Sequence, residues 1–181
     1  DELYQWNKTS IQNSISDVGP YLYPIGFPLL LSPIYYFFGM DFVSMKIFCS
    51  LFFLSAIPFI YLLFRAYFQS GFYAVIVACL TLFNAHFIIF SDNILSDFPY
   101  MFFCFLTLYL MALKYNLRNQ LLLGFCLFFS YFIRDIGIFL LPTIFVYQIT
   151  QFNRYKNKIF IVVPHLVFGL LFFLARDFFP Y

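Results

Sequence analysis

The stretch from residue 43 to residue 64, VSMKIFCSLFFLSAIPFIYLLF, decides the class of fold. It is long enough to cross a bilayer as one helix, because a predominantly apolar run of roughly 18 residues or more spans the hydrocarbon core. The whole chain of 181 residues is similarly apolar, with 64% hydrophobic, 26% aromatic and only 10% charged residues. An ordinary soluble domain has about a quarter of its residues charged. The composition therefore predicts an integral membrane protein.

Further apolar runs follow this span, separated by short polar breaks. They predict transmembrane helices at about 72–90, 98–113, 120–133, 136–150 and 159–175. The stretch 120–150 is divided in two because, at about 1.5 Å per residue, one helix of that length is too long for a single crossing. The predicted fold is all-α, a polytopic transmembrane helix bundle in a single domain over residues 1–181. Because the chain starts at Asp1 and stops at DFFPY, we expect it to be a fragment of a longer protein.

The charges predict the orientation of the bundle, since basic residues collect in cytoplasmic loops. If the span 43–64 ends at the cytoplasm, six basic residues lie in cytoplasmic turns: Arg65, Lys114, Arg118, Arg154, Lys156 and Lys158. The same threading places all 8 acidic residues at the opposite face. We therefore expect a protein of the plasma or inner membrane whose active face is extracytoplasmic.

The segment 21–40, YLYPIGFPLLLSPIYYFFGM, contains no charged residue but three prolines, Pro24, Pro28 and Pro33. Proline breaks the hydrogen-bond ladder of a helix and biases the preceding residue toward extended geometry. With 43–64 running inward, both ends of this segment belong outside. We predict an outer loop at 1–20 and then a Pro-rich interfacial helix, with its tyrosines at headgroup level. An ordinary kinked crossing is the alternative.

Ionisable residues near the outer face are the candidates for chemistry, because charge at membrane depth is costly and usually functional. They are Asp1-Glu2 in DELYQW, Asp92 and Asp97 in SDNILSDFPY, Arg134-Asp135 in FIRDIGIFLLP, and Arg176-Asp177. Asp97 is either the cap of the helix that starts at 98 or a functional carboxylate, and the two roles are compatible. Asp92 is expected to be solvated. Arg134 either pairs with Asp135 or holds a phosphate, whose oxygens match the guanidinium fork.

Other residue types predict no site. The four cysteines lack the paired spacing of zinc sites and are expected to be small core hydrophobes. His86 and His165 have no second ligand at helical spacing, and Asn84 with the Ser and Thr residues is expected to bond between helices. A net charge of +2 without a Lys/Arg-rich segment excludes nucleic acid as a partner.

Four stretches, in this order, resemble motifs of polytopic glycosyltransferases of the GT-C superfamily. They are DELY, YPIGFPLLLSPIYYFFG, SDNILSDFPYMFF and SYFIRDIGIFLLP. That superfamily includes the protein O-mannosyltransferases and the bacterial lipid A aminoarabinose transferase. The resemblance covers most of the chain, and its specificity comes from the order of the four short motifs.

The resemblance implies transfer of a sugar from a polyprenyl-phosphate donor to a glycan, lipid or protein acceptor at the extracytoplasmic face, with inversion. It places the catalytic carboxylates at Asp1 and Asp97, and we expect Glu2, Arg134 and Tyr23 to bind substrate. A carboxylate takes the proton of the acceptor while a cation stabilises the departing lipid phosphate. No cofactor is implied with certainty, and a divalent cation bridging carboxylates and phosphate is left open. Membrane lipids are the other expected partner.

A polytopic transporter subunit and a non-catalytic envelope assembly protein are the alternatives. A transporter is expected to place polar residues or broken helices near the bilayer midplane. Here the middles of the spans are nearly all Phe, Leu and Ile, and the charges lie at the outer rim. This pattern favours interfacial chemistry over transport. In an assembly protein the acidic residues would only cap helices or lie solvated in loops.

Overall fold

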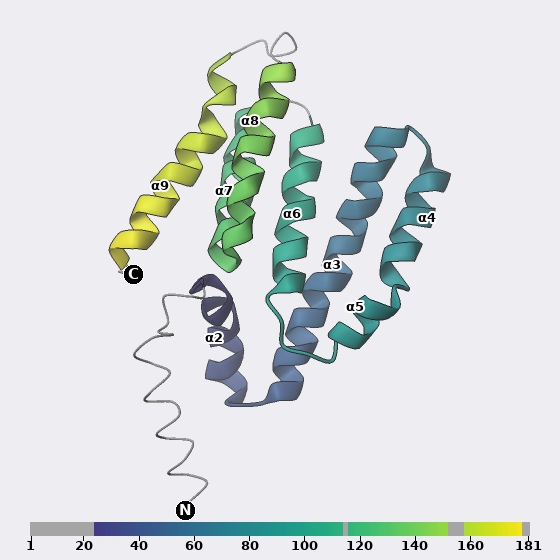
Figure 1. The fold of residues 1–181 in the computed structure, drawn as a ribbon. Coiled ribbons are helices and arrows are strands. Elements are labelled where there is room, and N and C mark those ends of the chain that lie inside the picture. Colours follow the sequence, from purple (N-terminus) through teal and green to yellow (C-terminus); the bar gives the residue numbers. More distant parts are fainter. Residues whose placement is uncertain (1–23, 114–115, 152–157, 179–181) are drawn as a thin grey trace, which may run out of the picture.

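The computed structural model describes residues 24–113, 116–151 and 158–178 (Figure 1). Within these ranges the chain is helical and has no strand, which confirms the all-α class for this part of the chain. The elements are α2 (Gly26–Phe38), α3 (Phe42–Phe68), α4 (Gly71–Leu82), α5 (Ala85–Phe90), α6 (Asp97–Ala112), α7 (Leu117–Ile133), the 3₁₀ turn η2 (Asp135–Phe139), α8 (Leu140–Thr150), η4 (Lys158–Ile161) and α9 (Val163–Phe178). The predicted outer loop 1–20 lies outside the described residues.

The long helices form a row in the order α4, α3, α6, α7 and α9, in which each packs against the next (Figure 1). Helix α8 returns along α7, and α2 lies at the end of the bundle where α6 begins and α7 ends. Helix α2 contacts both α3 and α7 there. The start of α6, the end of α7 and the start of α2 are therefore neighbours, although they are far apart in the sequence.

Helix α3 is the one helix of the described ranges that is long and apolar enough to cross a membrane. The other apolar helices have 10–17 residues. Length and composition thus support membrane association through α3. A polytopic bundle requires that the remaining helices also cross a membrane, and this stays a prediction.

Prolines mark the beginnings of helices in this chain. Pro28, Pro99, Pro142 and Pro164 each lie within the first three residues of a helix. A proline costs little there, because the first N–H groups of a helix have no intrahelical acceptor. Pro142 and Pro164 lie inside the apolar stretches 136–150 and 159–175, in the first turns of α8 and α9. Pro58, by contrast, does lie inside α3.

Helix α2 runs through Pro33, so the interruption expected from this proline does not occur. Pro33 has no N–H to donate to the carbonyl of Leu29, four residues earlier. The hydroxyl of Ser32 donates to that oxygen instead, at 2.9 Å. Tyr35 and Tyr36 are 55% and 82% exposed. The position of α2 at the end of the bundle fits an interfacial helix, although its placement in a membrane stays a prediction.

Two of the predicted apolar stretches are interrupted. The stretch 72–90 is two helices, α4 and α5, because Asn84 caps the second: its Oδ1 accepts from the backbone N–H of His86 at 2.9 Å. This corrects the expectation that Asn84 bonds between helices. The stretch 120–150 breaks at the charged pair, where α7 ends at Ile133 and η2 begins at Asp135.

An aromatic core supports the beginning of α6. Phe98 is 1% exposed, and its ring centroid lies 5.1 Å from that of Phe53 in α3. Cys49 is also fully buried in this cluster, as expected of a small core hydrophobe, whereas the same expectation is wrong for Cys79, which is exposed in α4. Because Phe98 is anchored in this way, the backbone of Asp97 beside it has a defined position at the end of the bundle.

Candidate functional site

Asp97 and Arg134 form an ion pair at the end of the bundle where α2 lies. Asp97 is the first residue of α6, and Arg134 follows the last residue of α7 in extended conformation. Since α6 packs antiparallel against α7, these two ends meet, and Nη1 of Arg134 donates to Oδ1 of Asp97. Asp97 and Arg134 are the two predicted site residues that lie within the described ranges. The sequence analysis selected them from separate motifs, and the structure brings them together.

The interpretations of Asp97 as a helix cap and of Arg134 as the ion-pair partner of Asp135 both need correction. The residue at the cap position of α6 is Ser96, which makes no side-chain cap bond, while Asp97 lies in the first turn. A carboxylate there still interacts favourably with the helix dipole. Arg134 makes no ion pair with Asp135 in the described part of the chain, and Asp135 is exposed at the start of η2.

The sequence analysis missed Tyr100, which lies one turn after Asp97. Its ring faces the guanidinium of Arg134, with Cζ 5.9 Å from the ring centroid, close enough for a cation–π attraction. Cys104, one further turn along α6, lies on the same face of the helix. The spacing of 97, 100 and 104 places one face of α6 toward the ion pair, and this spacing was the signal available in the sequence.

A cleft of about 440 Å³ opens beside the guanidinium. Its lining includes Pro24, Phe27, Pro28, Ser96, Arg134 and Asp135. These residues belong to three separate stretches, YPIGFP, LSDFPY and FIRDIG. Three of the four stretches that resemble the glycosyltransferase motifs therefore meet at one cleft.

Two glycines make this meeting of backbones possible. A Cβ on Gly26 would overlap the carbonyl oxygen of Phe132, and a Cβ on Gly137 would overlap the peptide between Ser130 and Tyr131. The N–H of Gly137 also donates to the carbonyl of Arg134 at 2.8 Å. The glycines of YPIGFP and RDIG thus allow α2 and η2 to lie directly against the end of α7.

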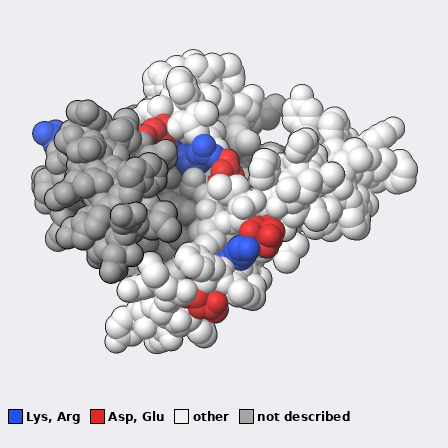
Figure 2. Space-filling model, turned by 60° about the horizontal axis from the view of Figure 1, so that its bottom comes forward, with Lys and Arg blue, Asp and Glu red and all other residues white. Residues whose placement is uncertain are grey.

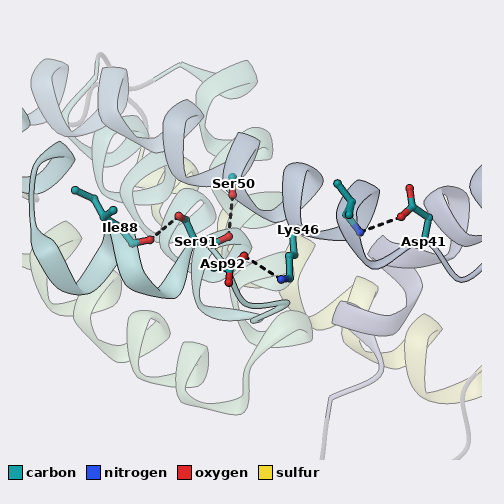
Figure 3. A network of polar contacts seen from close by, with 7 residues as sticks. Asp41, Lys46, Ser50, Ile88, Ser91 and Asp92 are labelled. Atoms are coloured by element: carbon teal, nitrogen blue, oxygen red, sulfur yellow. Dashed lines mark hydrogen bonds and ion pairs between the residues drawn. The ribbon is translucent and has the colours of Figure 1, made fainter.

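A second ion pair lies at the same end of the bundle. Nζ of Lys46 in α3 is 2.9 Å from Oδ1 of Asp92, whose side chain is 86% exposed, as predicted for a solvated carboxylate (Figure 3). Ser50 donates to the carbonyl of Ser91 at 3.3 Å, and Ser91 donates to Ile88 at 2.7 Å. The segment 91–97 is therefore held at both ends by ion pairs, to α3 through Asp92 and to α7 through Asp97.

The charged residues of this end stand out on its surface. Acidic and basic side chains lie next to one another among uncharged side chains (Figure 2). Asp41 adds a carboxylate that caps α3, accepting from the backbone N–H groups of Val43 and Ser44 at 3.0 and 3.3 Å. The hydroxyl of Ser44 and the N–H of Val43 lower the pKa of Asp41 below its ordinary value of 3.8.

The other predicted site residues are not tested by this geometry. Asp1, Glu2 and Tyr23 lie outside the described residues. His165 lies near the start of α9, where its Nε2 is 3.2 Å from Oε1 of Gln148. Among the described residues, no group of three or more His, Cys, Asp and Glu side chains is placed to hold a metal ion.

Comparison with known proteins leaves the family open. The chain matches no protein-family model, no curated protein and no solved structure. The resemblance to GT-C glycosyltransferases therefore rests on the four short motifs, and the function that it implies is a proposal.

Proposed function

We propose that this chain is the donor-binding part of a membrane glycosyltransferase that moves a sugar from a polyprenyl phosphate to an acceptor at the extracytoplasmic face. One observation supports the proposal above the others. Asp97 and Arg134, assigned to catalysis and to phosphate binding from motifs 37 residues apart, form one ion pair beside a cleft. The antiparallel packing of α6 on α7 brings them together, so the two assigned roles fall at one place.

Arg134 suits the phosphate of such a donor. Its guanidinium lines the cleft, and it is only partly buried, with a side-chain exposure of 39%. Asp97 accepts from one of its terminal nitrogens, and a guanidinium has further N–H donors in the same plane for phosphate oxygens. Phe27 and Pro28 of α2 provide an apolar wall beside the charge. A phosphate attached to an isoprenoid chain has this combination of charge and apolar surface.

The transfer step is an in-line substitution. The O–H or N–H bond of the acceptor breaks and its proton passes to a carboxylate, while the acceptor atom bonds to the anomeric carbon. The bond from that carbon to the phosphate oxygen breaks, and its electron pair leaves with the polyprenyl phosphate. Arg134 stabilises the charge that develops on this phosphate. Attack from the face opposite the leaving group gives inversion.

The carboxylates of this step are Asp97 and, by resemblance, Asp1 with Glu2 as its substitute. Asp97 is the one that the structure describes beside the arginine. Tyr23, next to the cleft residue Pro24 in sequence, is proposed to contact the donor. A divalent cation between these carboxylates and the phosphate is compatible with the proposal and is tested by chelation in the same assay.

The test uses the protein in its membrane, supplied with a radiolabelled polyprenyl-phosphate sugar. Arg134→Ala and Asp97→Asn are expected to abolish transfer at matched expression, since a cation or carboxylate that acts in the transition state is typically worth about 100-fold or more. Lys46→Ala and Asp92→Asn are the matched controls, because they break an ion pair of the same kind at the same end of the bundle. These controls are expected to retain transfer.

The outcomes separate the proposal from its alternatives. Equal transfer by all four variants would show that Asp97 and Arg134 take no part in the reaction. Transfer by none of the proteins, wild type included, from any polyprenyl-phosphate sugar would favour a transporter subunit or a non-catalytic assembly protein. Loss in the Asp97 and Arg134 variants alone supports the proposed chemistry.

A further inference from the structure

A second cavity, of about 690 Å³, has Asp97 of the ion pair in its lining. Its walls are largely apolar: Phe87, Phe90, Leu95, Met101, Phe105 and Leu140 line it. They come from α5, the segment before α6, α6 itself and the start of α8. Ligand pockets in proteins range from about 300 to 1,000 Å³, so this cavity has the size of a binding site.

The cavity has one polar wall. Asp97, Tyr100 and Cys104 line it, and their spacing puts them along one stripe of α6. Asp97 lies at the end of this stripe, at the start of the helix, and is the charged residue of the lining. A ligand in this cavity thus meets apolar side chains along most of its length and a carboxylate at one end.

The ion pair has one member in the lining of each space. Arg134 lines the smaller cleft, Asp97 lines the apolar cavity, and the bond between them joins the two linings. A phosphate bound to Arg134 would therefore lie in the cleft, and a group that approaches Asp97 from the larger space would lie in the cavity. This arrangement suits a two-substrate reaction, because the donor and the acceptor reach the pair from different spaces.

We propose that the apolar cavity binds the acceptor, and that the acceptor is an amphiphile with a hydroxyl or amine at the end of an apolar chain. This inference rests on the proposed function, which leaves a glycan, lipid or protein acceptor open. Asp97 receives the acceptor group at the mouth of the cavity, and the chain lies along α6 toward Phe105. A strongly polar glycan or peptide does not fit this lining, since its polar groups would lose water without gaining partners.

A photoreactive hexadecanol, with a diazirine in its chain, tests the cavity in the protein reconstituted in nanodiscs. Photolysis and peptide mass spectrometry report the residues that it labels. We expect labelling of the peptides carrying Phe87 to Leu95 and Met101 to Phe105, and suppression of it by excess unlabelled hexadecanol. Labelling of the exposed Leu166 and Leu170 in α9, 65% and 63% exposed, serves as the background that excess does not suppress.

Variants of Leu95 make the test specific to the cavity. Leu95→Trp is expected to remove the suppressible labelling because the larger side chain fills the space, whereas Leu95→Ala retains it. Two results would overturn the proposal. In the first, excess hexadecanol suppresses the labelling of these peptides no more than it suppresses the labelling of α9. In the second, Leu95→Trp leaves the labelling of these peptides unchanged. Suppression by excess farnesyl phosphate would also overturn it, because the donor chain would then occupy the cavity.

A separate readout tests the proposed function on which the inference rests. Farnesyl phosphate is expected to protect Arg134 from modification by phenylglyoxal, read on the peptide that contains it. Absence of this protection would count against donor binding at Arg134. It would not change the result of the hexadecanol labelling, which reports on the cavity alone. Failure of the cavity and failure of the phosphate site are thus seen in different peptides.

Discussion

Gly26 at the start of α2 lies directly against the carbonyl oxygen of Phe132 near the end of α7. No side chain beyond hydrogen fits between these two backbones. This contact places Pro24, Phe27 and Pro28 at the cleft beside Arg134, which is two residues from Phe132. The cleft therefore depends on a glycine that does not itself line it.

Gly26→Ala is expected to displace α2 and to lower stability by about 1–3 kcal/mol, the usual cost of overpacking. The measurement is the thermal denaturation of the purified protein in detergent. Gly169→Ala in α9 is the control, because an added Cβ there meets nothing within 4 Å and alanine favours a helix by up to about 1 kcal/mol. A Gly26 variant as stable as wild type would contradict the close packing of α2 on α7.

Asp97→Asn is expected to change the stability little, by less than about 1 kcal/mol, because exposed ion pairs are screened by solvent. The side chains of Asp97 and Arg134 are 55% and 39% exposed. Denaturation of this variant next to wild type checks the expectation. A loss of several kcal/mol would make the ion pair structural, and a loss of activity would then no longer indicate chemistry.

Gln148 is expected to hold α7, α8 and α9 together at the end of the bundle opposite the site. It is fully buried, donates to Oε1 of Gln120 at 3.1 Å, and lies next to His165 through its own oxygen. Gln148→Leu leaves the amide of Gln120 without this partner and is expected to cost about 1–3 kcal/mol. In a double-mutant cycle, adding Gln120→Leu is expected to cost less than the two single changes combined. Additive losses would show that the two amides do not interact.

Thr107→Val is expected to stabilise the protein by about 1 kcal/mol, because a buried hydroxyl loses its hydrogen bonds to water on folding and gains none in the protein. Thr107 is 0% exposed, and its Oγ1 has no hydrogen-bond partner within the described residues. This differs from the sequence expectation that Thr residues bond between helices. Thr81→Val is the matched control, since Thr81 donates to the carbonyl of Val77 at 2.9 Å and gains nothing from the change. Equal effects of the two substitutions would contradict the prediction.

The cap of α3 is expected to make stability depend on pH in the acid range. The folded state lowers the pKa of Asp41 below 3.8, first through the hydroxyl of Ser44 and then through the N–H of Val43. A lowered folded pKa means that the carboxylate stabilises the protein above the ordinary value, and that this contribution is lost as the pH falls through the folded pKa. The melting temperatures of wild type and Asp41→Asn should therefore converge as the pH is lowered from about 5 to below 3.8. A difference that is constant over this range would show that Asp41 titrates alike in both states.

The sequence by itself determined the helical, apolar class of the chain and several of its boundaries. Apolar run length, the charged break at Arg134 and the prolines at helix starts are local features, because helix geometry and proline stereochemistry act over a few neighbouring residues. Two of the candidate residues for the site, Asp97 and Arg134, could also be selected from their type and their place near predicted span ends.

Only the tertiary structure decided which of these residues meet. Arg134 has Asp135 as its neighbour in sequence, yet it pairs with Asp97, and Lys46 pairs with Asp92 across 46 residues. These choices follow from the packing of α6 on α7 and of α3 on α6, which no local pattern encodes. The contact of Gly26 with Phe132 and the division of the site into two cavities depend on the same packing. Local sequence sets where each helix begins and ends, while the contacts between helices set the partner of each charge.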